Sequence, residues 1–153
     1  MYYLKRKPKT AKEKAPKPRK ESVSSLVKKL DRVFSEFIRL RDSRPYGYKM
    51  FRCISCGEFK PYAQADCGHF ISRTHMSTRF DENNCHAECK FCNRYKSDHM
   101  IGYQHNLIVK LGNDRFNYLL AKGRQTKKWS AWELDILIKH YQAEVERMKN
   151  ERL

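Results

Sequence analysis

The chain has 153 residues, enough for one modest hydrophobic core with flanking arms and too few for two independent enzymatic domains. Its 33 lysines and arginines against 17 acidic residues give a net charge of +16, which favours polyanionic partners, nucleic acid first among them. No stretch approaches the roughly 18 apolar residues of a membrane span, and the N-terminus lacks an apolar secretory signal. We therefore expect no membrane role and a cytoplasmic location, where paired cysteines indicate metal rather than disulfides.

Residues 1–21 are predicted to form a disordered basic arm. The first 20 residues contain nine lysines and arginines against Glu13 alone, with three prolines among them. Such a segment buries too little apolar surface to offset its chain entropy. It would either hold DNA phosphates or only keep the chain soluble, and a charge run is compatible with both.

Residues 22–44 are predicted to form an amphipathic helix. Its apolar side chains recur at alternating steps of four and three, and Pro45 and Gly47 end the pattern. The side chains on this stripe are Leu26, Leu30, Val33, Phe37 and Leu40.

Residues 101–153 are predicted to be a helical C-terminal region. One helix should cover about 98–111 and a shorter one 113–123. The last helix has a clear start, because Ser130 and Glu133 have the spacing of a capping box. We interpret its apolar face as core, although the C-terminal half could instead pair with a second subunit. That face consists of Leu134, Leu137, Ile138, Tyr141, Val145 and Met148.

The segment 45–100 holds all six cysteines, and four of them form two Cys-x-x-Cys knuckles. Each knuckle lets two thiolates reach one ion, and two knuckles make a tetrahedral structural zinc site with no open position. The insert between them, residues 57–88, is longer than the roughly 15–20 residues of a plain zinc ribbon, so a folded unit is expected there. The predicted zinc ligands are Cys53, Cys56, Cys89 and Cys92, whereas Cys67 and Cys85 are interpreted as ordinary small buried residues.

The insert and the residues after the second knuckle contain the side chains of a metal-assisted phosphodiesterase. Hydrolysis near neutral pH needs a base, for which a neutral imidazole is well matched, and a hard divalent cation held by oxygen ligands. His69 can be the base, and Asp66 and Asn93 can hold Mg²⁺ or Mn²⁺. Each of these residues alone is more often a hydrogen-bonded structural residue, so their order along the chain matters.

That order resembles a known nuclease family. His69, then Asn84, then Asn93 directly after the last knuckle cysteine follow the pattern of HNH, or ββα-metal, endonucleases. A narrower likeness is to the NinG (Rap) recombination proteins of lambdoid phages. It rests on Cys53-Ile-Ser-Cys56-Gly57, Asp66-x-Gly68-His69-Phe70, Arg79-Phe80-Asp81-Glu82-x-Asn84 and Cys89-x-x-Cys92-Asn93-x-x-Lys96-Ser97.

The resemblance implies an α+β fold in which a zinc-clamped ββα-metal core, residues 45–100, is flanked by N- and C-terminal amphipathic helices. It implies three catalytic residues: His69 as general base, Asn84 fixing the hairpin loop through backbone hydrogen bonds, and Asn93 as ligand of the catalytic metal. The chain departs from HNH enzymes at Gly68, where they commonly carry a further metal ligand; here Asp66 is the candidate.

Several cations are candidate DNA contacts. Lys96 follows Asn93 on a predicted helix, close enough to contact a phosphate. Arg73, His75 and Arg79 lie between the hairpin and Asn84, where they could clamp phosphates or simply form a solvated loop. His86 could contact a phosphate or make a structural hydrogen bond.

By resemblance, the function is metal-dependent, structure-selective cleavage of branched recombination intermediates, Holliday junctions and D-loops, by a phage-encoded enzyme in the bacterial cytoplasm. Symmetric resolution needs two active sites, so a homodimer is expected. The alternatives are a non-catalytic zinc-ribbon DNA-binding protein, which needs the cysteines but not His69 or Asn93, and an HNH nickase acting on linear duplex.

Overall fold

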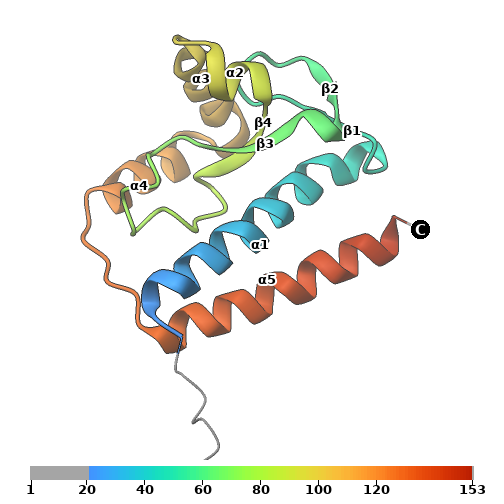
Figure 1. Ribbon diagram of the computed structural model, residues 1–153. Coiled ribbons are helices and arrows are strands. Elements are labelled where there is room, and N and C mark those ends of the chain that lie inside the picture. Colours follow the sequence, from blue (N-terminus) through green and yellow to red (C-terminus); the bar gives the residue numbers. More distant parts are fainter. Residues whose placement is uncertain (1–20, 153) are drawn as a thin grey trace, which may run out of the picture.

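The computed structural model describes residues 21–152, which form five α-helices and two small antiparallel sheets (Figure 1). The predicted α+β class is confirmed. The predicted basic arm, residues 1–21, lies outside the described residues except for Glu21. Every helix within the described range is too short or too polar to span a bilayer. The helices are α1 (Val23–Ser43), α2 (Lys90–Tyr95), α3 (His99–Leu111), α4 (Asn113–Gly123) and α5 (Ala131–Glu151); the strands are β1 (Met50–Arg52), β2 (Phe59–Pro61), β3 (Ala65–His69) and β4 (Cys85–Cys89); and the 3₁₀ turns are η1 (Arg44–Tyr46) and η2 (Tyr62–Gln64).

Helices α1 and α5 run side by side in the same direction and carry the largest hydrophobic cluster (Figure 1). The apolar stripes read from the sequence meet here: the rings of Phe34 and Tyr141 pack edge to face with centroids 4.9 Å apart. Helix α5 begins at the capping box that was predicted, with Ser130 and Glu133 each bonding the backbone of the other. The buried face of α5 is therefore part of the core of this chain.

The two hairpins lie beside α1. Strand β3 pairs with β4 so that Asp66 is opposite Glu88 and His69 is opposite Cys85. Successive side chains of a strand point to opposite faces of the sheet. His69 lies on the face of β3 that is directed toward the hydrophobic cluster of α1. Asp66 lies on the opposite face together with Gly68, which packs against Tyr103 of α3. This alternation decides which groups can meet around β3.

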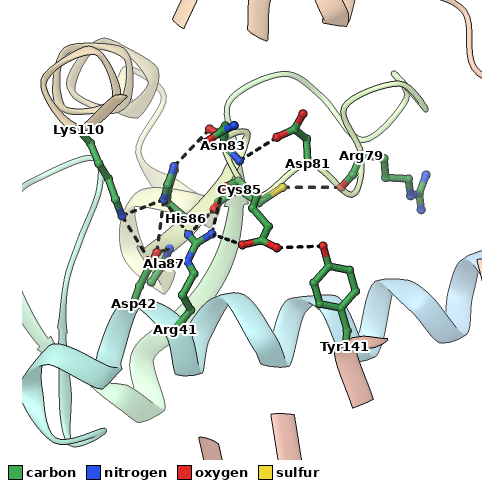
Figure 2. A network of polar contacts seen from close by, with 11 residues as sticks. Arg41, Asp42, Arg79, Asp81, Asn83, Cys85, His86, Ala87, Lys110 and Tyr141 are labelled. Atoms are coloured by element: carbon green, nitrogen blue, oxygen red, sulfur yellow. Dashed lines mark hydrogen bonds and ion pairs between the residues drawn. The ribbon is translucent and has the colours of Figure 1, made fainter. Parts of the chain in front are cut away.

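A buried polar network joins α1 to β4 (Figure 2). The Oδ2 atom of Asp42 accepts a hydrogen bond from the Ala87 amide at 2.7 Å, and Arg41 donates to the Cys85 carbonyl at 2.8 Å. Burial alone would raise the pKa of the Asp42 carboxyl, but its contact with His86 at 3.5 Å and the cations of Arg41 and Lys110 hold it well below its usual range. The carboxylate is thus charged and paired inside the protein.

His86 belongs to the same network. Its Nε2 atom lies 3.3 Å from the Asn83 carbonyl, which can only accept, so Nε2 carries the proton and Nδ1 accepts from Arg41 at 2.9 Å and Lys110 at 3.0 Å. Burial lowers the pKa of this imidazole, consistent with a neutral ring. Only 2% of His86 is exposed. This burial matches the predicted structural hydrogen bond rather than a contact with a phosphate.

We predict that Asp42→Ala lowers the free energy of unfolding by about 1–3 kcal/mol, because it leaves the Ala87 amide without its acceptor and the partly buried Arg41 without its carboxylate. Urea denaturation of the zinc-loaded protein measures this. The matched control is Asp135→Ala on α5, whose Lys139 partner is 72% exposed. That change should cost less than about 0.5 kcal/mol. Similar losses in the two variants would contradict the importance of the network.

Candidate functional site

Four cysteine side chains converge between the two hairpins. Ligand atoms of Cys53, Cys56, Cys89 and Cys92 all lie within 4.8 Å of one another. The first pair follows β1, and the second spans the end of β4 and the start of α2. Four thiolates at this spacing suit a tetrahedral zinc ion, and the cluster could hold one.

The backbone of both knuckles is shaped for this cluster. Gly57 adopts a left-handed φ of 74°, and its amide closes the first turn on the Cys53 carbonyl at 2.9 Å. The amides of Cys89 and Cys92 point at the sulfur atoms of Cys53 and Cys89, at 3.3 and 3.5 Å. Burial raises the pKa of Cys53 to about 11 and also raises that of Cys92, so these thiols would ionise together only around a cation.

A polar groove of about 580 Å³ runs beside β3. Residues from both faces of this strand line it, so it follows the edge that β4 leaves unpaired. Helix α1 borders one side and α2 and α3 the other. The groove brings together Asp66, His69, Arg73, Asn93 and His99.

A backbone carbonyl fixes the Nε2 atom of His69 as a hydrogen-bond donor. Its Nε2 atom lies 3.2 Å from the Arg79 carbonyl, so Nε2 carries the proton and Nδ1 the lone pair. Burial, and then the positive charge of Arg73, lowers the pKa of His69 below its usual 6.5. The ring is therefore neutral near pH 7 and able to accept a proton.

Asn84 is fully buried and holds the loop between β3 and β4. Its Oδ1 atom accepts from the Ile71 amide at 2.7 Å, and Nδ2 donates to the carbonyls of Ile71 and Thr78 at 2.9 and 3.0 Å. All bonds go to backbone, so this side chain fixes the loop that carries Arg79.

Asp66 and Asn93 are joined to each other. The Asn93 amide nitrogen donates to Asp66 at 3.2 Å, which leaves Oδ1 on the other side of the amide. Both oxygens of Asp66 also accept from Arg94, at 2.7 and 2.9 Å. Although burial would raise the pKa of this carboxyl, the Arg94 bonds lower it. A metal bound directly to Asp66 would have to compete with that guanidinium.

The four predicted DNA contacts have different surroundings. Arg73 is exposed and lines the groove, and Lys96 is exposed at the end of α2. His75 is bonded through Nδ1 to the Gly123 carbonyl at 3.0 Å. Arg79 makes a two-pronged ion pair with Asp31 of α1 at 2.5 and 2.9 Å, which raises its pKa. The guanidinium of Arg79 thus ties the loop to α1.

Two features of the site carry no signal in the sequence spacing. Ligand atoms of Cys67 and Cys85 lie within 4.8 Å of each other and of His69, since the strand register places all three on one face. In addition, His99 lines the groove, and a buried Glu88 lies behind it at 2.6 Å. The one hint that the sequence offers for this pair is an acidic residue, Glu88, in the Cys85–Cys89 strand, in which all five residues are buried.

The family model described as "Bacteriophage Lambda NinG protein" matches residues 3–151. The chain belongs to the NinG family. Over 127 residues it is 31% identical to Protein ninG of Escherichia phage 933W and 30% identical to Protein ninG of Escherichia phage lambda and of Salmonella phage P22. These alignments cover 82% of this chain but only 58–59% of the relatives, so the chain spans less than two thirds of their length. No solved structure shows a significant match.

We predict that Cys89→Ser abolishes both zinc binding and cooperative folding. Zinc contributes on the order of 10 kcal/mol to small zinc domains, which rivals the whole stability of a domain. Metal analysis and circular dichroism measure the two effects. The control is Cys67→Ser, which lies outside the four-cysteine cluster and should keep about one zinc per chain; equal zinc contents would contradict the assignment.

Proposed function

We propose that this NinG-family protein is a metal-dependent endonuclease of the HNH type that cuts branched DNA, such as Holliday junctions and D-loops. One observation carries the proposal: a single groove is lined by a neutral imidazole that carries its lone pair on Nδ1, at His69, and by an amide whose nitrogen is bonded to Asp66, which leaves its oxygen as the ligand atom, at Asn93. His69 ends β3, and Asn93 lies in α2 directly after Cys92 of the four-cysteine cluster.

His69 acts as the general base. Its Nδ1 atom takes a proton from the water that attacks the phosphorus atom, while the Arg79 carbonyl keeps the ring in the required tautomer. Asn84 and the Arg79–Asp31 ion pair hold that carbonyl in position. The base is thus supported by the loop on one side and by α1 on the other.

The residues present fit a hard divalent cation. Asn93 offers an oxygen ligand in a polar groove, and Asp66, already bonded to Arg94, orients the amide rather than ligating. When bound there, Mg²⁺ or Mn²⁺ would neutralise charge on the scissile phosphate and stabilise the leaving oxygen.

Phosphate binding would fall to cations that no carboxylate engages tightly. Arg73 stands at the groove, and Lys96 is 3.7 Å from the exposed Asp98, a contact that water screens. The nine basic side chains among residues 1–20 add a large sequence-independent attraction. These groups would hold the backbone of the DNA rather than read its bases.

Symmetric cutting of a junction requires two active sites, so we propose that the protein acts as a homodimer. Trp132 and Ile136 lie one turn apart on α5 and are 73% and 45% exposed, which makes this helix the first candidate for the contact. Sedimentation in the presence of a four-way junction measures the stoichiometry. One chain per junction would count against the dimer.

We predict that His69→Ala lowers the rate of four-way junction cleavage by about 10²–10⁴-fold while junction affinity stays within about twofold. His105→Ala, an exposed histidine of α3, is the matched control. Gel assays with labelled junctions measure both quantities in Mg²⁺ or Mn²⁺. Unchanged cleavage would refute His69 as the base.

The same assay separates the proposed activity from its alternatives. Binding without cleavage by the wild-type protein would favour the non-catalytic zinc-ribbon function. Equal cutting of a junction and of linear duplex with the same sequence would favour an HNH nickase. Preferential cutting of the junction supports the structure-selective enzyme.

We predict that cleavage by the zinc-loaded protein is independent of pH near neutrality and declines on acidification. Burial lowers the pKa of His69 below 6.5, so the base form is present above that pKa and is lost as pH falls through it. Single-turnover rates should drop about tenfold per pH unit below the pKa. The residual activity of His69→Ala should lack this limb, and zinc content is checked at each pH.

A further inference from the structure

Glu88 is a fully buried carboxylate in the middle of β4. It pairs across the sheet with Asp66, so the two carboxylates stand side by side on the face directed toward α2 and α3. Burying a charge is costly unless it is paired, so the partners of Glu88 indicate what it is for.

The surroundings of Glu88 are built around its carboxylate. Its Oε1 atom accepts from the Ser55 hydroxyl at 2.5 Å and from Nδ1 of His99 at 2.6 Å, while Oε2 has no partner among the described residues. A Cβ atom at Gly68 would lie 2.4 Å from Oε2. The glycine in β3 therefore leaves the room that Glu88 occupies.

The contact with Glu88 fixes the state of His99. A carboxylate can only accept, so the Nδ1 atom of His99 carries a proton, and in the neutral ring the lone pair lies on Nε2. His99 lines the groove, and because Nδ1 points at the buried carboxylate, Nε2 is the nitrogen left to bind a ligand there. Histidines that bind metals commonly donate their other ring nitrogen to a carboxylate in this way.

Asn93 is arranged in the same way. Asp66 accepts from its amide nitrogen, just as Glu88 accepts from His99. The neighbouring carboxylates of Asp66 and Glu88 thus each accept a hydrogen bond from one side chain, Asn93 and His99 respectively. Both of these side chains line the groove, and each has a second atom that can act as a metal ligand.

We propose that Nε2 of His99 and Oδ1 of Asn93 together bind a divalent cation, with Glu88 and Asp66 as positioning residues. The cation's part in DNA cleavage rests on the proposed function, whereas its binding does not. An imidazole nitrogen beside an amide oxygen suits Mn²⁺ and the later transition metals better than Mg²⁺. The predicted order of affinity is therefore Mg²⁺ below Mn²⁺.

The test is a titration of the zinc-loaded full chain with Mn²⁺, in which the electron paramagnetic resonance signal of the free ion measures how much Mn²⁺ is bound. His99→Ala should weaken Mn²⁺ binding by at least about tenfold, and Glu88→Gln, which keeps the shape but removes the charge, by about 10–100-fold. His105→Ala, an exposed histidine on the same helix, should leave the affinity within about twofold of wild type.

Each outcome bears on the site. Equal Mn²⁺ affinity in His99→Ala and His105→Ala, or no Mn²⁺ binding by the wild type, overturns the inference. If His99→Ala fails to fold by circular dichroism, the Glu88→Gln and His99→Gln variants decide in its place. If Mn²⁺ binding depends on His99 but the protein cuts no DNA, the proposed function is refuted and this inference stands. If the protein cuts DNA but its Mn²⁺ binding does not depend on His99, this inference is refuted and the proposed function stands.

Discussion

The convergence of Cys53 and Cys56 with Cys89 and Cys92 is the constraint on which the rest of the site depends. The apolar cluster around these side chains is small, with Phe51, Ala65 and Ala87 as its members besides cysteine, so hydrophobic burial alone holds β1, β3 and β4 together only weakly. A metal ion bound by all four thiolates would supply the missing stability. It would also set where β4 ends and α2 begins, and hence where Asn93 stands.

The groove lies at the unpaired edge of β3, with α1 on one side and α2 and α3 on the other. On one face, His69 lies against the α1 side, where the Arg79–Asp31 pair and Asn84 fix its surroundings. On the other, Asp66 lies toward α2 and α3 and turns Asn93 into the groove. Under the proposed function, a proton acceptor and a metal ligand would approach one phosphate from opposite faces of this strand. The α1–α5 pair and the Asp42 network lie beside the strand and support it.

Several arginines of this protein make ion pairs and hydrogen bonds within the fold. Arg79 and Arg94 pair with aspartates of other segments, and Arg41, which pairs with its neighbour Asp42, joins α1 to β4 through the Cys85 carbonyl. Pairing fixes a guanidinium and removes it from competition for phosphate, and the net charge of +16 is the excess that remains after each acidic residue is set against one basic residue.

The sequence by itself determined the features that depend on short spacing. Helical periodicity placed α1 and α5, the Ser130–Glu133 pair marked the start of α5, and the two Cys-x-x-Cys knuckles identified the cluster that could hold zinc. Only the tertiary structure decided the partners of the site residues: Arg94 on Asp66, the Arg79 carbonyl on His69, and Glu88 behind His99. These contacts join segments whose relative register is set by packing and by the cysteine cluster, and no local pattern encodes that register.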